Sequence, residues 1–200
     1  IAFPLAYIIS QKTEKVQRTL VMLVMLPMWM SFLIRTYSWM ALLQDTGIIN
    51  SFLAKLGIDP IHMINTSGAV ILGMVYNFLP YMIMPIYSVM AKLDYSMVEA
   101  AQDLGGNRLT VIKRCIIPMS MPGVISGITM VFVPSVSTFY ISQKLGGGSF
   151  DLIGDVIERQ FQQSYNYNLG ASLSLVLMVL ILICMAVMNR FSGDEEGMVI

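Results

Sequence analysis

Four stretches of this chain are apolar over 20 residues or more and almost free of charge. Residues 66–91, 116–143 and 169–188 contain no charged side chain, and residues 19–44 contain only Arg35. About 20 apolar residues in a helix cross the roughly 30 Å hydrocarbon core of a bilayer. A buried helix of a soluble domain would explain one such stretch but not four. We therefore predict an all-α fold, a polytopic transmembrane helix bundle in a lipid bilayer.

The distribution of Lys and Arg predicts the orientation. These residues accumulate in short cytoplasmic loops. Eight of them lie in segments 10–18 and 92–115 and in the tail, and three lie in the intervening loops. We expect the first set, and the C-terminus, on the cytoplasmic side.

The chain is expected to form one transmembrane domain over residues 1–200. It opens inside an apolar run, so we expect an N-terminal part to precede it. The predicted elements are a partial span at 1–9, spans at about 19–44, 66–91, 119–141 and 169–188, a cytoplasmic segment at 92–118, and an outer loop at 142–168.

Composition and motifs exclude several function classes. The net charge is zero, whereas a general nucleic-acid binder carries a basic excess. The pattern G-x-x-x-x-G-K-[ST], which would cradle the phosphates of ATP, is absent. His62 is the only histidine and has no cysteine or carboxylate cluster at ligand spacing, so no metal site and no catalytic residues are predicted.

Prolines interrupt the apolar stretches and predict kinked helices. A proline inside a helix removes a backbone donor, which a bilayer tolerates where neighbouring helices or water satisfy the freed carbonyl. Such kinks suit a bundle with a path inside, although a kinked packing helix without a path has the same pattern. The prolines concerned are Pro27, Pro80, Pro85, Pro122 and Pro134.

The segment 92–118 carries the most specific pattern. Ser96 and Glu99 have the spacing of a capping box, so a short helix should begin near Met97. Gly105 and Gly106 should end it, since glycine takes the left-handed conformation found at helix ends. Asn107 is placed to cap a second helix that continues into the next span.

This segment resembles the signature of ABC importer permeases. The sequence Glu99-Ala-Ala, three residues, Gly105, nine residues, then Cys-Ile-Ile-Pro118 follows the pattern E-A-A, three, G, nine, I-x-L-P. Cys115 and Ile117 replace Ile and Leu of that pattern, both by apolar residues. The resemblance implies the type I ABC importer permease fold, with a cytoplasmic coupling helix seated in a cleft of an ATPase subunit. The residues implied in ATPase coupling are Glu99, Ala100, Ala101, Leu104 and Gly105. Glu99 could equally serve only to cap its own helix.

Further segments resemble one branch of these permeases. Residues 27–39, 79–87, 146–148 and 152–157 are similar to the B-type permease subunit of spermidine/putrescine importers. The resemblance implies a bacterial inner-membrane protein that acts with a sister C-type permease, an ATPase dimer and an external polyamine-binding protein. ATP and Mg²⁺ would be bound by the ATPase, and this chain would hold no cofactor. The alternatives are a permease for iron, thiamine or phosphonate, a secondary transporter or channel, and a scaffold subunit.

A polyamine path is expected to use aromatic and hydroxyl groups here, because the four full spans contain no Asp or Glu. An ammonium over an aromatic face gains about 0.5–2 kcal/mol. The sister permease would supply the missing carboxylates. The candidate path residues are Trp29, Tyr37, Trp39, Tyr76, Tyr81, Ser135, Ser137, Thr138 and Tyr140.

Some of these residues have a second interpretation, and Arg35 is set apart from them. Tyr37, Trp39 and Tyr140 could instead belong to the interfacial aromatic belt. Arg35 is expected about 25 Å along a helix from Arg18, near the outer headgroups, as a structural or gating residue.

Overall fold

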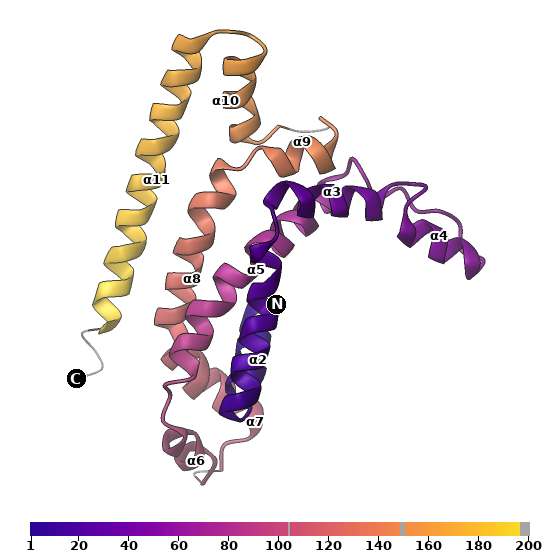
Figure 1. Cartoon of the computed structure of the whole chain (residues 1–200). Coiled ribbons are helices and arrows are strands. Elements are labelled where there is room, and N and C mark those ends of the chain that lie inside the picture. The colour runs from indigo at the N-terminus through magenta and orange to yellow at the C-terminus, as the bar shows by residue number, and fades with distance from the viewer. Residues whose placement is uncertain (104, 149–150, 197–200) are drawn as a thin grey trace. The chain divides into compact units, whose positions relative to one another are not determined.

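The computed structural model describes residues 1–103, 105–148 and 151–196, and every regular element in these ranges is a helix (Figure 1). The labels η1 and η2 mark a short 3-10 helix and a π-helix. In chain order the elements are α1 (Ala2–Ser10), α2 (Glu14–Met25), η1 (Leu26–Trp29), α3 (Phe32–Leu43), α4 (Ile48–Lys55), α5 (Ser67–Met90), α6 (Tyr95–Asp103), α7 (Arg108–Val111), η2 (Ile112–Ile116), α8 (Ile117–Ser137), α9 (Tyr140–Gly146), α10 (Ile153–Gln162) and α11 (Tyr167–Glu196).

The chain forms two compact units. Unit 1 comprises Ile1–Met25, Leu79–Phe132 and Ile183–Ile200, and unit 2 comprises Leu26–Phe78 and Val133–Leu182. The long helices α5, α8 and α11 each contribute residues to both units, so each unit is built from parts of the same helices.

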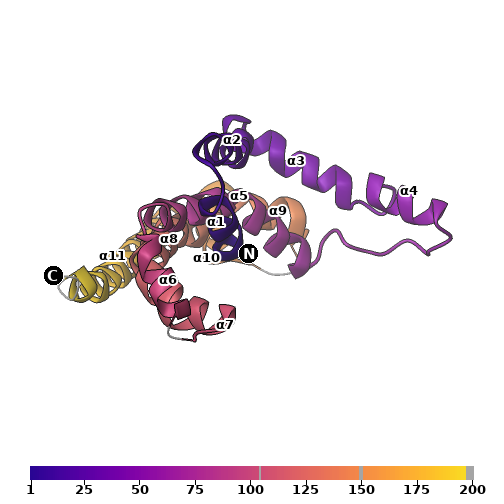
Figure 2. The same ribbon diagram turned by 90° about the horizontal axis from the view of Figure 1, so that it is seen from below.

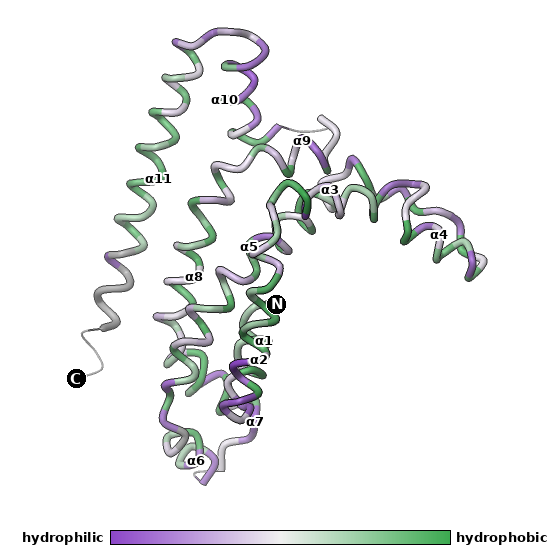
Figure 3. The backbone as a smooth tube through the Cα atoms, viewed as in Figure 1, coloured by the Kyte–Doolittle hydropathy of each residue, from purple (hydrophilic) through white to green (hydrophobic). Residues whose placement is uncertain are grey.

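Three continuous helices are long and apolar enough to cross a membrane. They are Ser67–Met90, Arg108–Ser137 and Tyr167–Met188 among the described residues. The pair Glu14–Trp29 and Phe32–Lys55 would be a fourth span if the two bent halves are taken together. Figure 3 shows long hydrophobic runs along α5, α8 and α11, with polar residues gathered in the connecting segments.

The expectation of one helix over residues 19–44 is wrong. Pro27 lies in η1, where the α-helical pattern gives way to a 3-10 turn, and the amide of Met30 donates to its carbonyl over 3.2 Å. Proline cannot donate to the preceding turn. Ser31 then takes an extended ψ of 133° before α3 begins. Arg35 therefore does not lie on one helix with Arg18.

The expected span at 119–141 also ends earlier than its apolar residues suggest. α8 ends at Ser137, and Tyr140 begins the separate helix α9. The expected outer loop at 142–168 contains most of α9 and all of α10. Hydropathy alone does not mark this break, because the residues on both sides of it are apolar or uncharged.

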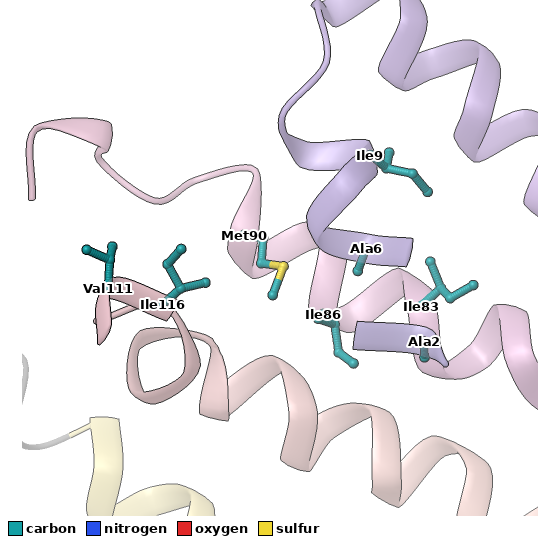
Figure 4. Packing of buried hydrophobic residues seen from close by; sticks show 8 residues of the cluster. All are labelled: Ala2, Ala6, Ile9, Ile83, Ile86, Met90, Val111 and Ile116. Carbon is teal, nitrogen blue, oxygen red and sulfur yellow. The ribbon is translucent and has the colours of Figure 1, made fainter. Parts of the chain in front are cut away.

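The core of unit 1 joins the start of the chain to the second half of α5. Figure 4 shows this cluster, in which small alanines of α1 face isoleucines of α5. Partly buried residues of α2, α6 and α8 pack around it. The cluster consists of Ala2, Ala6, Ile9, Ile83, Ile86, Met90, Val111 and Ile116.

Two glycines bring the backbones of α5 and α8 together within unit 1. A Cβ on Gly123 would lie 2.8 Å from the carbonyl oxygen of Pro85 and 3.0 Å from the Cα of Ile86. A Cβ on Gly127 would lie 2.8 Å from the Sδ of Met82. Small residues four apart permit this close packing of membrane helices.

The core of unit 2 joins α3, the first half of α5 and α9. It consists of Leu43, Ile64, Ala69, Val70, Ile141 and Leu145. The amide of Asn65 donates to the carbonyl of Leu145 over 2.9 Å. The buried amide side chain of Asn50 exchanges two hydrogen bonds with the backbone of Ile61, each of 2.9 Å, and so fixes the loop after α4.

Candidate functional site

The coupling segment, residues 92–118, begins with a cap that differs from the predicted one. α6 begins at Tyr95, and the amide of Ser96 donates to Oδ1 of Asp94 over 3.0 Å. This backbone hydrogen bond, with a second from the Ser96 side chain, holds the pKa of Asp94 below its usual value of 3.8. The predicted box between Ser96 and Glu99, with a start near Met97, is therefore replaced by capping from Asp94.

The predicted end of α6 is present. The amide of Gly105 donates to Gln102 over 2.8 Å, and that of Gly106 donates to Ala101 over 3.1 Å. Gly105 has a φ of +81°, which only glycine adopts without strain. Oδ1 of Asn107 accepts from the amide of Thr110 over 2.8 Å and caps α7, as the sequence predicted.

The residues of α6 differ in exposure. Glu99 and Ala100 are exposed, as is Gly105 after the helix. Ala101 is half-buried and packs against the unit 1 cluster. Leu104 lies outside the described residues. The exposed side of α6 therefore presents a carboxylate next to a small alanine, without a bulky side chain at position 100.

α6 is tied to a membrane-length helix through α7 and η2. The helical chain is continuous from Arg108 to Ser137. Val111 and Ile116, at its start, are buried in the unit 1 cluster. Figure 2 shows α6 and α7 side by side, and residues of the two helices contact each other. The coupling segment is thus packed on unit 1 at the beginning of that helix.

The structure brings four of the candidate path residues together as two pairs, both in unit 2. The rings of Trp39 and Tyr76 meet edge to face with centroids 5.2 Å apart. The rings of Tyr37 and Tyr140 are 6.2 Å apart at 84°. Nζ of Lys144 lies 5.9 Å from the ring centroid of Tyr37 and 5.8 Å from that of Tyr140. The Tyr37–Tyr140 pair is therefore in contact with an ammonium group of this chain, that of Lys144.

The other path candidates are distributed over both units. Trp29 is 90% exposed in unit 2 and Tyr81 is 39% exposed in unit 1. Ser137 is exposed and donates to the carbonyl of Val133 over 3.0 Å, Thr138 is half-buried, and Ser135 is half-buried with an interaction of its own. None of the contacts given above joins these hydroxyl groups to the aromatic pairs.

Arg35 is buried within unit 2. The residue is only 9% exposed, and its Nε and Nη1 have no hydrogen-bond partner among the described residues. The isolated charge in an apolar stretch was visible in the sequence. Its burial was not, because it depends on the break before α3.

The segment between α9 and α11 forms a polar pocket of about 430 Å³ in unit 2. Arg159 pairs with Asp151 at 2.5 Å, which raises the pKa of Arg159. Asp155 is buried, and its carboxylate accepts from the hydroxyl of Ser142 over 2.9 Å and from the amide of Leu152 over 2.8 Å. In the sequence these acids lie in the expected outer loop at 142–168, where no pattern marks Asp155 as the residue that joins α9 to α10.

No metal site is evident within the described ranges. They contain no group of three or more His, Cys, Asp and Glu side chains placed to hold a metal ion. Nδ1 of His62 lies 2.9 Å from Oδ1 of Asp45, and both side chains are more than half exposed.

Comparisons with known proteins agree with this architecture. The chain is 42% identical over 168 residues to the spermidine/putrescine transport system permease protein PotB of Haemophilus influenzae, covering 83% of this chain and 59% of that protein. It is 42% identical over 163 residues to PotB of Escherichia coli K12, covering 80% of this chain and 59% of that protein. The chain thus spans less than two thirds of the length of these relatives.

Solved structures share the fold. A bacterial ABC transporter that imports the acidic polysaccharide alginate superposes with a TM-score of 0.74, covering 96% of this chain and 71% of that one, at 17% identity. The family model for the binding-protein-dependent transport system inner membrane component matches residues 2–192. The α6 turn, the membrane-length helices and this match over nearly the whole chain together show that the protein belongs to the family of binding-protein-dependent transport system inner membrane components.

Proposed function

We propose that this chain is the B-type permease subunit of an ATP-driven polyamine importer and forms half of its translocation path. The observation that carries the proposal is the 42% identity to two PotB proteins over about four fifths of the chain. Its partners would be a sister C-type permease, an ATPase dimer that binds ATP and Mg²⁺, and an external polyamine-binding protein. The C-terminus and α6 would face the cytoplasm, in line with the distribution of Lys and Arg.

In this proposal α6 transmits motion of the ATPase to the spans. Support comes from the exposed Glu99 and Ala100 and from the sharp turn at Gly105. Closure of the ATPase dimer on ATP would move α6 and turn the path outward, and hydrolysis would reset it. A ligand shifts such an equilibrium only through its different affinities for the two states.

The polyamine would pass aromatic faces of this chain. Trp29 and Tyr81 are exposed and contact no ammonium group among the described residues, in contrast to Tyr37 and Tyr140, which contact Lys144. We assign Trp29 and Tyr81 the greater part of this role. The outer segment with α9 and α10 is the proposed docking surface for the binding protein.

Uptake by the complete complex tests the substrate. Full-length protein, sister permease, ATPase and binding protein are reconstituted in liposomes with ATP inside, and labelled spermidine is supplied outside. Unlabelled spermidine and putrescine should compete, and an anionic solute such as sulfate should not. Uptake that ignores both polyamines would exclude a polyamine importer. Normal rates in Trp29→Ala and Tyr81→Ala would instead favour a scaffold role for this chain.

A charge on the exposed side of α6 tests coupling. Ala100→Glu places a carboxylate where the ATPase cleft is proposed to approach, and uptake should fall about tenfold, equivalent to 1.4 kcal/mol. Ala100 is preferable to Ala101, because Ala101 packs on the unit 1 cluster and its substitution would also disturb folding. Gln102→Glu adds the same charge at another exposed position of α6 and is the control. Equal uptake in both variants and in the unmodified complex would remove the coupling role.

A further inference from the structure

Arg35 carries a buried charge whose hydrogen bonding is incomplete among the described residues. The residue is 9% exposed, and its Nε and Nη1 are buried without a hydrogen-bond acceptor among the described residues. Arginine stays protonated in proteins. A charge removed from water without a partner is strongly unfavourable. The guanidinium group therefore requires an acceptor that the described residues do not supply.

A small cavity lies beside this side chain within unit 2. Its volume is about 130 Å³. That is the volume of about four water molecules at 30 Å³ each, and it suits one short side chain. The lining residues are Met30, Arg35, Ser38, Trp39, Leu42 and Tyr76.

The cavity lining favours a hydrogen-bond acceptor. Trp39 has only a donor, its indole N–H, and Tyr76 has a phenol that can donate. The edge-to-face contact of their rings, 5.2 Å between centroids, holds this wall in place. The lining contains no carboxylate. A cation such as a polyamine would be repelled by Arg35, whereas a carboxylate would be attracted.

A carboxylate partner for Arg35 cannot come from the apolar stretches of this chain. The apolar stretches 19–44, 66–91, 119–141 and 169–188 contain no Asp or Glu. We propose that an Asp or Glu side chain from a membrane helix of the sister permease enters the cavity and pairs with Arg35. A carboxylate can accept two parallel N–H bonds from one guanidinium group. This inference rests on the proposed function only in assuming a second permease subunit.

Two measurements on Arg35→Met test the proposal, because the expected effects differ in kind. In the full-length protein alone, removal of an unpaired buried charge should leave the unfolding temperature unchanged or raise it. In the complete complex, recovery of the sister permease with the tagged protein should fall about tenfold or more, since one partner of a buried charge pair is lost. Arg35→Lys keeps the charge but loses the planar, forked guanidinium group. Recovery of the sister permease with this variant should lie between the values for the unmodified protein and for Arg35→Met.

Arg18→Met is the matched control. Arg18 pairs with Glu14 on the exposed side of α2, and the two side chains are 80% and 78% exposed. Exposed pairs of this kind contribute little. Neither the unfolding temperature nor the recovery of the sister permease should change.

A charge exchange identifies the partner residue. Arg35→Glu should prevent assembly, and replacing one particular Asp or Glu in the membrane helices of the sister permease by Arg should restore it. Unchanged assembly in both Arg35→Met and Arg35→Glu would overturn the proposal. Loss of bound phospholipid with intact assembly would identify a lipid phosphate instead, and equal destabilisation of the protein alone would indicate a partner within the chain. Polyamine is absent from these assays, so a failed substrate assignment would leave their outcome unaffected.

Discussion

Single residues determine the geometry of the coupling segment. Gly105 has a φ of +81° and no atom within 4 Å of an added Cβ, so its role is conformational rather than steric. Asp94, at the other end of α6, accepts a hydrogen bond from the amide of Ser96, the second residue of the helix. Gly105 was identifiable from its position in the signature, whereas Asp94 was not, because Ser96 offered a competing cap two residues later.

Gly105→Ala should destabilise the turn after α6. An L residue in the left-handed region costs about 1–2 kcal/mol relative to glycine. The loss should appear as a lower unfolding temperature and faster amide hydrogen exchange in α6. Gly68→Ala is the control, since Gly68 begins α5 and its added Cβ meets only Thr66 Oγ1 at 3.7 Å. Equal effects of the two changes would mean that the φ of Gly105 is not a constraint.

The cap at Asp94 should make α6 sensitive to pH. The hydrogen bond from Ser96 lowers the pKa of Asp94 in the folded state below the ordinary 3.8. A lowered folded-state pKa stabilises the fold above the unfolded-state pKa, and this contribution is lost as pH falls through the folded-state value. Protection of α6 amides from hydrogen exchange should therefore decrease below about pH 4. In Asp94→Ala the protection should be lower at neutral pH, and this acid-dependent part should be absent.

The packing of α5 on α8 leaves little room for a larger side chain. The Cβ of a residue at position 123 would meet backbone atoms of Pro85 and Ile86, which cannot rotate away. At position 127 the nearest atom is the Sδ of Met82, which can move. Glycine is therefore required more strictly at position 123 than at position 127.

Gly123→Val should destabilise unit 1 by about 1–3 kcal/mol, the range found for overpacked cores. Gly127→Val should cost less, because methionine can change rotamer, although the Met82 carbonyl oxygen is also near, at 3.2 Å from the added Cβ. Ser126→Ala, on the exposed side of α8, serves as the control. Thermal unfolding of the purified variants measures the order. The reverse order for positions 123 and 127 would contradict the backbone contact.

Sequence patterns located the helices better than their interruptions. The apolar stretch at 66–91 corresponds to α5 within one residue, because its prolines do not end the helix. The stretch at 19–44 contains η1 and the break before α3, since Pro27 lies where a 3-10 turn forms. Both sides of this break are mostly apolar, so hydropathy does not mark it. The burial of Arg35 and the contact of Lys144 with Tyr37 depend on the tertiary arrangement and have no signal in the spacing.

At the scale of the whole molecule, the proposed orientation places α6 and the segment between α10 and α11 on opposite sides of the membrane. Single cysteines test this after replacement of Cys115 and Cys184. In intact cells an impermeant maleimide should label Ser164→Cys and not Gln102→Cys, and in inverted vesicles the reverse. Both positions are exposed in the structure. Labelling of Gln102→Cys in intact cells would place α6 outside and contradict the orientation.

The uninterrupted helix from Arg108 to Ser137 has a mechanical consequence for unit 1. Its first turns are anchored in the cluster through Val111 and Ile116, and at Gly123 its backbone touches that of α5. A helix packed against its neighbour in this way cannot rotate about its own axis without moving that neighbour. A displacement of the turn at Gly105 would therefore move α8 and α5 together.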